Sequence, residues 1–531
     1  MPSARTATPS AWSPLRHPLF RTVWIAAFFS NIGTWVHDVG AAWLMTTLTP
    51  SPVMVALVRT ASALPMFLLA LPSGALADVL DRRRLLLFTQ ALMLLAAGAL
   101  AILSFADLVT PTGLLLLTFA LGIGTALNAP AWQSLAAELV PRADLTPAIS
   151  LHSASINLSR ALGPALGGIL IASAGAAANF ALNAVSFCGV IVVLYRWRRQ
   201  PRESVLPAER IVGAMRTGLR YVRHAPPVLA VLARSSAFTI FAAALLSLLP
   251  AYARFELGRG PTGYGVLLGL FGAGAVLTAV LLPRLRARLP AERIVALAVL
   301  IFAGALTVLA WLPIIGLVDV ASFLAGGAWL TLLSTFNSSI QAVVPSWVRG
   351  RVISVSILVF FGSMAAGSAL WGYVADVFGI SIAYTVASAG LLLGLYATHR
   401  LRIVNGDTLD LSPSPIWPAP TVREFTHDQG PVVVTVDYRI DPAKARHFRR
   451  VMQRVRRIRR RDGAINWGLL ADVVDPTHYT ETFVVESWLE HLRQHERVTV
   501  SDRTVLDKAR SFHVASERPT VTHFILERLS T

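Results

Sequence analysis

Twelve long apolar segments, separated by short breaks, occupy the chain from about residue 19 to residue 400. Each provides about 20 helical residues, enough to cross the roughly 30 Å hydrocarbon layer of a bilayer with its backbone polar groups satisfied. Only 14% of the 531 residues are charged, against about 25% in ordinary soluble proteins. We therefore predict an all-α membrane protein with spans at 19–47, 52–77, 84–106, 111–137, 147–173, 176–196, 228–253, 262–284, 290–313, 317–344, 348–376 and 379–400.

The arginines predict the orientation of these helices. Alternate loops are basic, while the opposite loops carry only Arg254 and Arg259. Because Lys and Arg concentrate on the cytoplasmic side, this pattern places both termini in the cytoplasm, under the plasma (inner) membrane. The formal charge of +18 is then largely a topology signal, and we expect no nucleic-acid partner. The basic loops contain Arg82 to Arg84, Arg142, Arg196 to Arg223, Arg284 to Arg293, and Arg349 with Arg351.

An internal repeat supports the count. A shift of 204 positions places Arg82 on Arg286 and Val140-Pro141 on Val344-Pro345. Two parallel six-helix repeats of this kind build transporters whose substrate site lies between the halves near the midplane. We predict a cytoplasmic segment (1–18), two six-helix bundles (19–196 and 228–400), a cytoplasmic loop between them with an amphipathic helix (197–227), a Pro-rich linker (401–420) and a small α+β domain (421–531).

The loop after the second span reads GALADVLDRRR from Gly74 to Arg84. It resembles the loop signature of the major facilitator superfamily, departing from it at Asp81, where the family usually has Gly. Gly74 would permit close helix contact and Asp78 would meet the positive end of a neighbouring helix, which the resemblance identifies as the eleventh. Arg82, Arg83 and Arg84 would hold the loop at the lipid headgroups. A plain stop-transfer cluster would require neither the Gly nor the Asp.

The fifth span contains Ser159-Arg160-Ala-Leu-Gly163-Pro164-Ala-Leu-Gly167-Gly168. This run is similar to a motif of the superfamily's drug/proton antiporters, with Ser159 in place of the first Gly. Gly163 and Gly167 lie on one helix face and allow close approach, while Pro164 permits a bend. Tight helix packing alone would also explain the glycines, so the export direction follows from the resemblance.

In finer detail, residues 19–400 resemble the enterobactin-exporter and transmembrane secretion-effector branch. The sequence segments on which this resemblance rests are Leu64-Pro65, Leu71-Pro72-Ser73-Gly74, Asn179 to Phe187, and Arg349 to Ser354. Many proton-coupled drug exporters have an Arg in the fourth helix four residues before a Gly, but here Thr118 precedes Gly122. Proton coupling therefore does not follow from that motif.

Three charges within the predicted spans are candidates for transport or coupling. Asp38 and Arg59 are about equally far from the turn between the first two helices, so we expect them to pair, either structurally or as a coupling site. Arg160 lies about 20 Å into the fifth helix, near the midplane of the membrane. It is a candidate for binding a substrate anion or for acting as a gate. We expect His37 to be a polar residue at the rim.

Polar and aromatic residues give the first, fourth, fifth and tenth helices the character of cavity-forming helices. Most such residues pack or bridge helices, so only a minority should touch substrate. The cavity candidates are Asn31, Trp35, Asn128, Trp132, Gln133, Asn157, Asn337 and Gln341.

The tail after residue 420 has the pattern β-α-β-β-α-β, with strands near 432–440, 467–474, 480–487 and 521–526. It resembles the dimeric ferredoxin-like proteins of the antibiotic-biosynthesis monooxygenase group. Regulation or dimerisation is the expected role, with a fused monooxygenase-like enzyme as the alternative. His491 and His495, one turn apart, are expected on a solvated helix face. The arginine run from Arg454 to Arg461 could touch anionic lipid, although a solvated face is the default.

These features together predict a secondary transporter, with or without proton coupling, that exports a small amphiphilic or siderophore-like compound by alternating access. An uptake transporter of the same fold is the alternative. We expect no catalytic residues, no metal and no cofactor, and the question of an enzyme stays open for residues 421–531. The predicted partners are the small-molecule substrate, the lipid bilayer and a second copy of the chain bound through residues 421–531.

Overall fold

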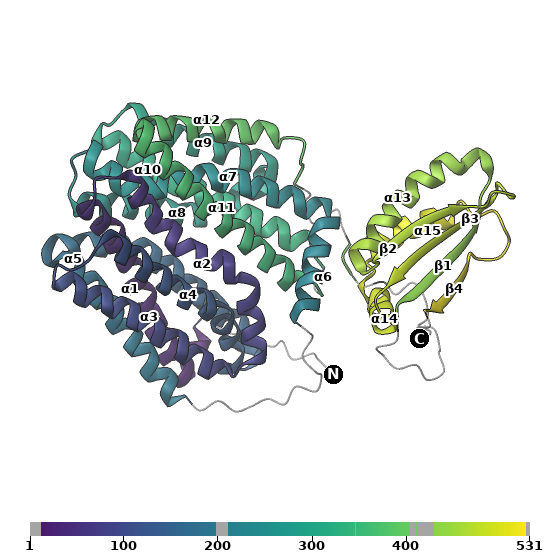
Figure 1. Cartoon of the computed structure of the whole chain (residues 1–531), viewed down its shortest axis with the longest axis horizontal. Helices are drawn as coiled ribbons and strands as arrows, with labels where there is room; N and C mark the ends of the chain where they lie inside the picture. Colours follow the sequence, from purple (N-terminus) through teal and green to yellow (C-terminus); the bar gives the residue numbers. More distant parts are fainter. Residues whose placement is uncertain are drawn as a thin grey trace, which may run out of the picture. The chain divides into compact units, whose positions relative to one another are not determined.

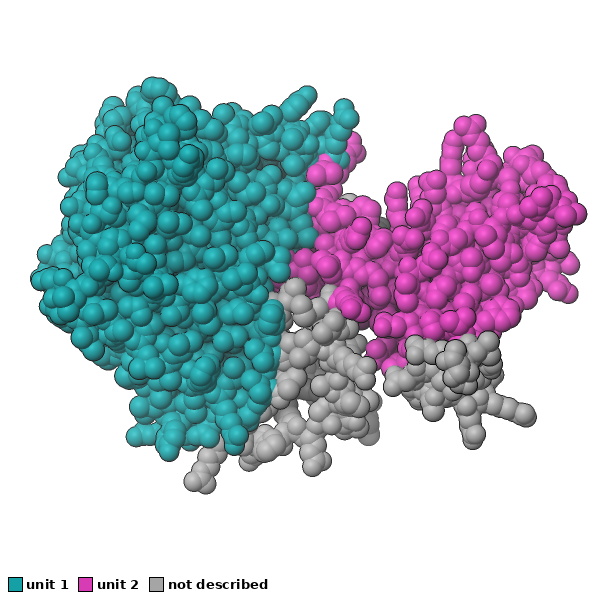
Figure 2. Space-filling view, in the orientation of Figure 1, with its two compact units in different colours: residues 1–208, 232–336, 356–400 teal, residues 209–231, 337–355, 401–531 magenta. Residues whose placement is uncertain are grey.

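The computed structural model describes residues 12–197, 211–345, 347–403, 410–412, 414 and 430–526. Within these ranges the side chains of a few helical residues, Asp78 among them, are not described. The chain divides into two compact units (Figure 2). The first comprises residues 1–208, 232–336 and 356–400, and the second comprises residues 209–231, 337–355 and 401–531.

The first half of the apolar region forms α1 to α5 (Figure 1). Several of these helices begin with Pro, whose missing N–H costs nothing in the first turn. Asp81 caps α3, because its side chain accepts a hydrogen bond from the backbone N–H of Arg84 at 2.9 Å. The helices are α1 (Pro18–Leu48), α2 (Pro52–Val79), α3 (Arg82–Phe105), α4 (Pro111–Leu139) and α5 (Leu145–Arg196), with 3-10 turns η1 (Ser13–Arg16) and η2 (Arg142–Asp144).

Helix α5 covers two of the predicted spans. It contains a kink at Gly175, whose φ of 79° lies in the left-handed region that favours glycine. The predicted break between residues 173 and 176 is therefore a kink that reverses the chain without a loop.

The second half contains six further apolar helices and one π-helical turn, η3 (Tyr252–Glu256). Among the described residues, ten helices of the whole chain are long and apolar enough to cross a membrane. Helix α5 supplies two of the predicted spans, which gives eleven, and α1 is not among the ten. The prediction of a mostly helical membrane protein is confirmed, and the count of twelve spans stays a prediction. The helices are α7 (Pro226–Ala251), α8 (Pro261–Arg288), α9 (Ala291–Trp311), α10 (Ile315–Val343), α11 (Arg349–Phe378) and α12 (Ile380–Ala397).

The second unit contains the amphipathic helix α6 (Ile211–His224), the segment 337–355 and the tail. In the tail, an antiparallel sheet has the strand order β2-β3-β1-β4. Alternate residues of β1, from Val432 to Tyr438, are buried and face the helices, as a period of two requires. The elements are β1 (Val432–Arg439), η5 (Pro442–Lys444), α13 (Ala445–Asp462), β2 (Asn466–Ala471), β3 (His478–Val485), α14 (Trp488–Arg497), α15 (Val500–Arg510) and β4 (Thr520–Ile525).

The strands of the tail lie within two or three residues of their predicted positions, but the second helical position holds two helices. Thr499 starts α15 with a capping box, in which the Thr499 side chain and Asp502 satisfy each other's backbone N–H groups. This cap ends α14 at Arg497 and begins a new helix three residues later.

Candidate functional site

A cavity of about 400 Å³ lies inside the first unit. Eight helices line it, namely α1, α2, α4 and α5 from the first half and α7, α8, α10 and α11 from the second. The cavity therefore lies between the two predicted repeats, where a substrate site was expected from the repeat.

The three charged candidates all line this cavity. Arg59 Nη1 lies 4.0 Å from Asp38 Oδ2, as expected for two positions equally far from the α1–α2 turn. The guanidinium of Arg160 lies over the ring of Trp35, 5.8 Å from its centroid. The site thus combines one ion pair with a second cation that rests on an aromatic face.

Two glycines position Trp35 and Arg160. A Cβ at Gly163 would collide with the Trp35 side chain, and a Cβ at Gly167 would lie 3.1 Å from that of Val39. These glycines let α1 approach α5 closely, as predicted from their spacing. Pro164, between them, lines the cavity. The motif in α5 therefore shapes the wall that carries Arg160.

The rest of the lining is mostly apolar and aromatic. Thr118 belongs to the lining, and its buried hydroxyl has no hydrogen-bond partner among the described residues. Sequence reasoning missed most of the aromatic walls, because aromatic residues in apolar helices do not stand out. These missed lining residues are Tyr264, Phe271, Trp329, Phe360 and Phe361.

The other polar candidates do not line the cavity. Asn128 Oδ1 accepts hydrogen bonds from Thr89 Oγ1 at 3.1 Å and Gln90 Nε2 at 3.4 Å, which join α4 to α3. Trp132 packs on the buried cluster that includes Leu151. The remaining candidates outside the lining are Asn31, Gln133, Asn157, Asn337 and Gln341, the last two of which hydrogen-bond each other at 3.3 Å.

The expectation for His37 was wrong. Its side chain is 1% exposed and packs against the ring of Phe180, with centroids 4.7 Å apart. Neither ring nitrogen has a hydrogen-bond partner in the part of the chain that the structure describes. His37 follows the helix periodicity of its neighbours and faces α5, so the polarity of the residue alone did not indicate its position.

Contacts between the two halves close the cavity at the end that carries the α1–α2 turn. A Cβ on Gly168 would lie 2.8 Å from the Cα of Gly265, so α5 and α8 meet backbone to backbone. Ser51 Oγ donates to Asp376 Oδ1 at 2.6 Å, and Arg254 Nη1 donates to Thr46 Oγ1 at 3.4 Å. The glycine contact and these two hydrogen bonds thus hold the two halves together at this end of the bundle.

The loop motif lies at the opposite end. Arg82 Nη1 donates to Glu138 Oε1 at 2.7 Å, and Arg83 donates to the carbonyl oxygens of Leu194 and Tyr195. No described atom lies within 4 Å of a Cβ built on Gly74, so the expected close helix contact is absent in this conformation. The side chain of Asp78 is outside the described residues. Arg84 begins α3 through its backbone bond to Asp81.

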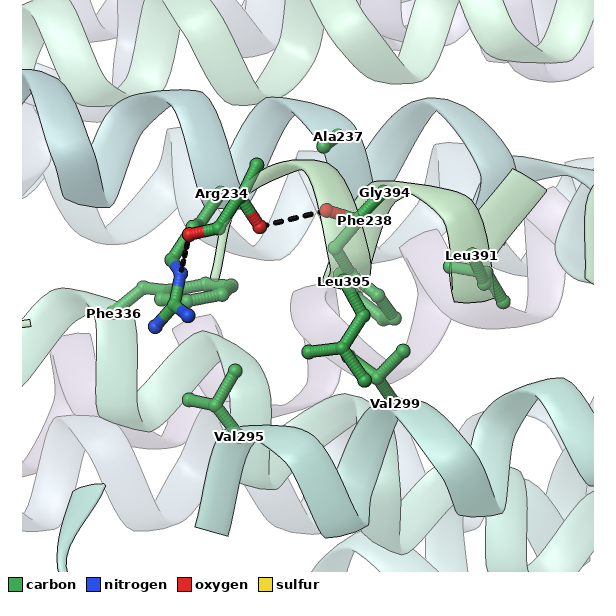
Figure 3. A pocket seen from close by; sticks show the side chains of 10 residues that line it. Arg234, Ala237, Phe238, Val295, Val299, Phe336, Leu391, Gly394 and Leu395 are labelled. Carbon is green, nitrogen blue, oxygen red and sulfur yellow. Dashed lines mark hydrogen bonds between the residues drawn. The ribbon is translucent and has the colours of Figure 1, made fainter. Parts of the chain in front are cut away.

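A second cavity, of about 20 Å³, is too small for more than a water molecule (Figure 3). Arg234 lines it together with apolar residues and donates to the carbonyl of Thr398 at 3.2 Å. The Nη1 atom of Arg234 donates to Glu292 at 2.6 Å. Because these bonds hold the guanidinium in place, this cavity is a packing gap at a structural ion pair.

In the tail, His491 and His495 are not on a solvated face as predicted. Their Nε2 atoms lie 3.1 Å apart, and His491 is 3% exposed. Burial, and then the neighbouring His495, lower the pKa of His491 to about 3, and burial followed by Arg459 lowers that of His495 to about 4. Both are therefore neutral at pH 7. No group of metal-ligating residues is found among the described residues.

The arginine run of α13 divides between two faces. Arg459 Nε donates to the fully buried Glu481 at 3.1 Å, and Arg461 binds both Asp462 and Asp502 at 2.7 Å. Others in the run, such as Arg456, remain exposed. The prediction of a uniformly solvated face was therefore only partly right.

The second unit also contains a stack of aromatic and arginine side chains. Tyr221 of α6 is 2% exposed and meets the edge of Trp347, with centroids 5.7 Å apart. Arg461 lies over Tyr221 at 5.5 Å, and Arg497 lies over Trp347 at 4.6 Å. Arg220 Nη2 donates to Glu490 at 3.1 Å. These contacts join α6, the segment 337–355 and the tail.

Comparisons with known proteins agree with this architecture. A family model described as "transmembrane secretion effector" matches residues 9–530, so the tail lies inside the match. The chain is 28% identical over 416 residues to the multidrug efflux pump Tap of Mycolicibacterium fortuitum, covering 75% of this chain and 99% of the pump. It is 24% identical over 368 residues to the staphyloferrin A transporter of Staphylococcus aureus, covering 68% of this chain and 90% of that transporter.

Among solved structures, a bacterial homologue of the human lysosomal transporter Spinster, inward-facing and unoccupied, aligns with a TM-score of 0.56 at 16% identity. The alignment covers 73% of this chain and 95% of that chain. At this identity the likeness concerns the fold.

Proposed function

Because the chain belongs to the transmembrane secretion effector family of major facilitator superfamily transporters, we propose that it exports a small amphiphilic or siderophore-like compound by alternating access. The observation that carries this is the cavity between the repeats, which joins Asp38, Arg59 and Arg160 to aromatic walls. Two relatives are a multidrug efflux pump and a staphyloferrin A transporter. Both names support an organic substrate, and the first supports export over uptake.

The geometry supports alternating access in a specific way. The end sealed by Gly168 and Gly265 is the end that the arginine pattern assigns to the outside. The conformation is then inward-facing, with both termini in the cytoplasm and the protein in the inner membrane. Substrate enters from the cytoplasm, and separation of α5 from α8 opens the outer end.

The test is transport into inside-out membrane vesicles. A panel of amphiphilic compounds and iron-free siderophores is offered with and without a pH gradient, using vesicles that lack the protein as the control. Accumulation of at least one compound only when the protein is present supports export. Release from preloaded vesicles without accumulation would identify an uptake transporter instead.

For residues 421–531 we propose a regulatory domain of ferredoxin-like topology. The arginine–aromatic stack around Tyr221 and Trp347 supports this, because it attaches the tail to the helix that links the two bundles. Loosening the stack should then alter transport rate without altering which compounds are carried. The alternative is a fused monooxygenase-like enzyme. Oxygen consumption by the purified full chain, offered a quinol or an aromatic substrate, would establish that role.

The tail also offers a surface for a second copy. Val433 is paired in register with Val484 and with Phe524, so the three side chains neighbour one another on the sheet face away from the helices, and Phe524 is 53% exposed. We propose that this face forms a homodimer. Light scattering of the full chain in detergent should show a dimer that Phe524→Glu converts to a monomer, while Val514→Glu, at an exposed site outside the sheet, leaves it intact.

A further inference from the structure

The cavity carries one more cationic than anionic side chain. Asp38 balances Arg59, because their charged groups are 4.0 Å apart. Arg160 has neither a carboxylate nor a hydrogen-bond partner among the described residues, and its only close polar contact is the face of Trp35. The described cavity lining contains no other ionisable group besides Tyr264, which is neutral near pH 7. The empty cavity therefore has a formal charge of +1.

An unbalanced cation at this depth is costly. A charge in the hydrocarbon region normally pairs with an opposite charge or contacts water, and a cation–π contact offsets only part of the lost hydration. A negatively charged group beside Arg160 would supply the missing counter-charge.

The remaining walls restrict what carries that negative charge. Trp329, Phe360 and Phe361 form an apolar, aromatic lining, which suits the non-polar body of an organic molecule and offers nothing to a small inorganic anion. We propose that the substrate is an organic monoanion whose negative group binds Arg160, and that the membrane potential drives its export. This inference rests on the proposed export function.

The charge balance of the cycle gives the driving force. The loaded cavity is neutral, since the substrate anion compensates Arg160, and it moves no net charge when the protein opens outward. After release, the cavity returns to the inside with its charge of +1. Each cycle therefore moves one negative charge outward, with no proton exchanged. Because the cell interior is negative, the potential favours the return of the positively charged cavity to the inside, and through that step it drives the whole cycle.

The expected size of the effect is set by the single charge. For one charge, each factor of ten in the equilibrium accumulation ratio corresponds to about 59 mV. Asp38 then acts as the fixed counter-ion of Arg59 throughout the cycle.

Binding tests the charge of the substrate. Three probes of one shape are titrated by calorimetry against the full chain in nanodiscs: naphthalene-2-sulfonate, neutral naphthalene-2-sulfonamide and the cation naphthalen-2-ylmethyl-trimethylammonium. We expect the sulfonate to bind at least about tenfold more tightly than the sulfonamide, as for other hydrogen bonds to charged groups. Arg160→Gln should remove the preference and Arg160→Lys should keep it. Arg456→Gln, at an exposed site on α13, is the matched control.

Transport tests the driving force. In inside-out vesicles, potassium with valinomycin sets a lumen-positive or lumen-negative potential, and a strong buffer of the same pH on both sides prevents a pH gradient. Naphthalene-2-sulfonate should accumulate about tenfold for each 59 mV of lumen-positive potential, and not at the opposite sign. A pH gradient imposed with equal potassium on both sides, where valinomycin holds the potential at zero, should give no accumulation.

The outcomes separate the two proposals. Tighter binding of the cation or the sulfonamide, or accumulation that follows the pH gradient and ignores the potential, overturns the inference and leaves export standing. If no probe binds and no compound of the wider panel is moved, export itself fails and the inference fails with it.

Discussion

The contact between Gly168 and Gly265 gives the sharpest test of how the bundle closes. In the structure a Cβ on Gly168 would lie 2.8 Å from the Cα of Gly265 and 2.9 Å from the carbonyl oxygen of Pro261. Both obstacles are backbone atoms that cannot rotate away. Gly168→Ala must therefore push α5 and α8 apart whenever this end is closed.

The cost follows from overpacking, which amounts to about 1–3 kcal/mol for a methyl forced into a packed contact. The penalty falls only on the conformation with this end closed. An equilibrium between closed and open states should shift toward open by about 5- to 150-fold. The higher helix propensity of Ala contributes to both states and cancels.

The assay is a distance measurement by pulsed electron paramagnetic resonance. Spin labels replace the exposed residues Thr47 and Phe378, which lie near the α1–α2 turn and at the end of α11, after removal of the single native cysteine, Cys188. Gly168→Ala should enlarge the long-distance population. Gly304→Ala is the matched control, because no atom lies within 4 Å of its added Cβ. Identical distributions for the two variants would refute the reasoning.

Three further predictions concern charged groups. The pKa of His491 is about 3 in the folded protein, against the ordinary 6.5. Below pH 6.5 the unfolded tail therefore binds more protons than the folded tail, so the free energy of unfolding is full above that pH and falls as the pH drops toward 3. The loss is up to about 1.4 kcal/mol per pH unit before solvent screening. A melting temperature of the tail that stays constant from pH 7 to 5 would contradict this. Asp38→Asn should lower the melting temperature by an amount equivalent to about 1 kcal/mol, because Arg59 loses its counter-ion while the side chains of the pair are 29% and 33% exposed; failure of Arg59→Gln to restore stability would argue against the pair. Glu490→Gln should weaken the attachment of α6 by about 1.5–3 kcal/mol, and unchanged amide exchange across α6 would rule this out.

The fold was largely predictable because each helix or strand is determined by the residue pattern of its own segment. Apolar runs of about 20 residues have few alternatives to a membrane helix, and the alternation of Val432 to Tyr438 can belong only to a half-buried strand. The kink at Gly175 was not predictable, since a Gly between two apolar runs is compatible with either a loop or a continuous helix.

The site was predictable only in its charges. Asp38, Arg59 and Arg160 could be identified because a charged side chain in a membrane helix costs free energy and is therefore rare outside functional or paired sites. A buried Asn can satisfy its side-chain amide by hydrogen bonds to many kinds of neighbour, and Asn128 accepts hydrogen bonds from Thr89 and Gln90 of α3. Which aromatic side chains face the cavity depends on helix rotation, and this is set by contacts such as that of Gly163 with Trp35.

The tail illustrates why a linker signal in the sequence does not determine the boundary of a compact unit. The prolines between residues 411 and 420 indicate a linker, and the arginines of α13 look like a solvated surface. Yet Arg461 lies over Tyr221, a residue of α6 more than two hundred positions earlier, which is buried by this contact and by Trp347. An arginine gains from an aromatic face and a carboxylate at the same time, so it can be the central residue of an interface while contributing nothing to the hydropathy pattern. The compact unit that contains the tail therefore includes α6, the helix that follows the first bundle in sequence, and any change that loosens the stack acts on the connection between the two halves.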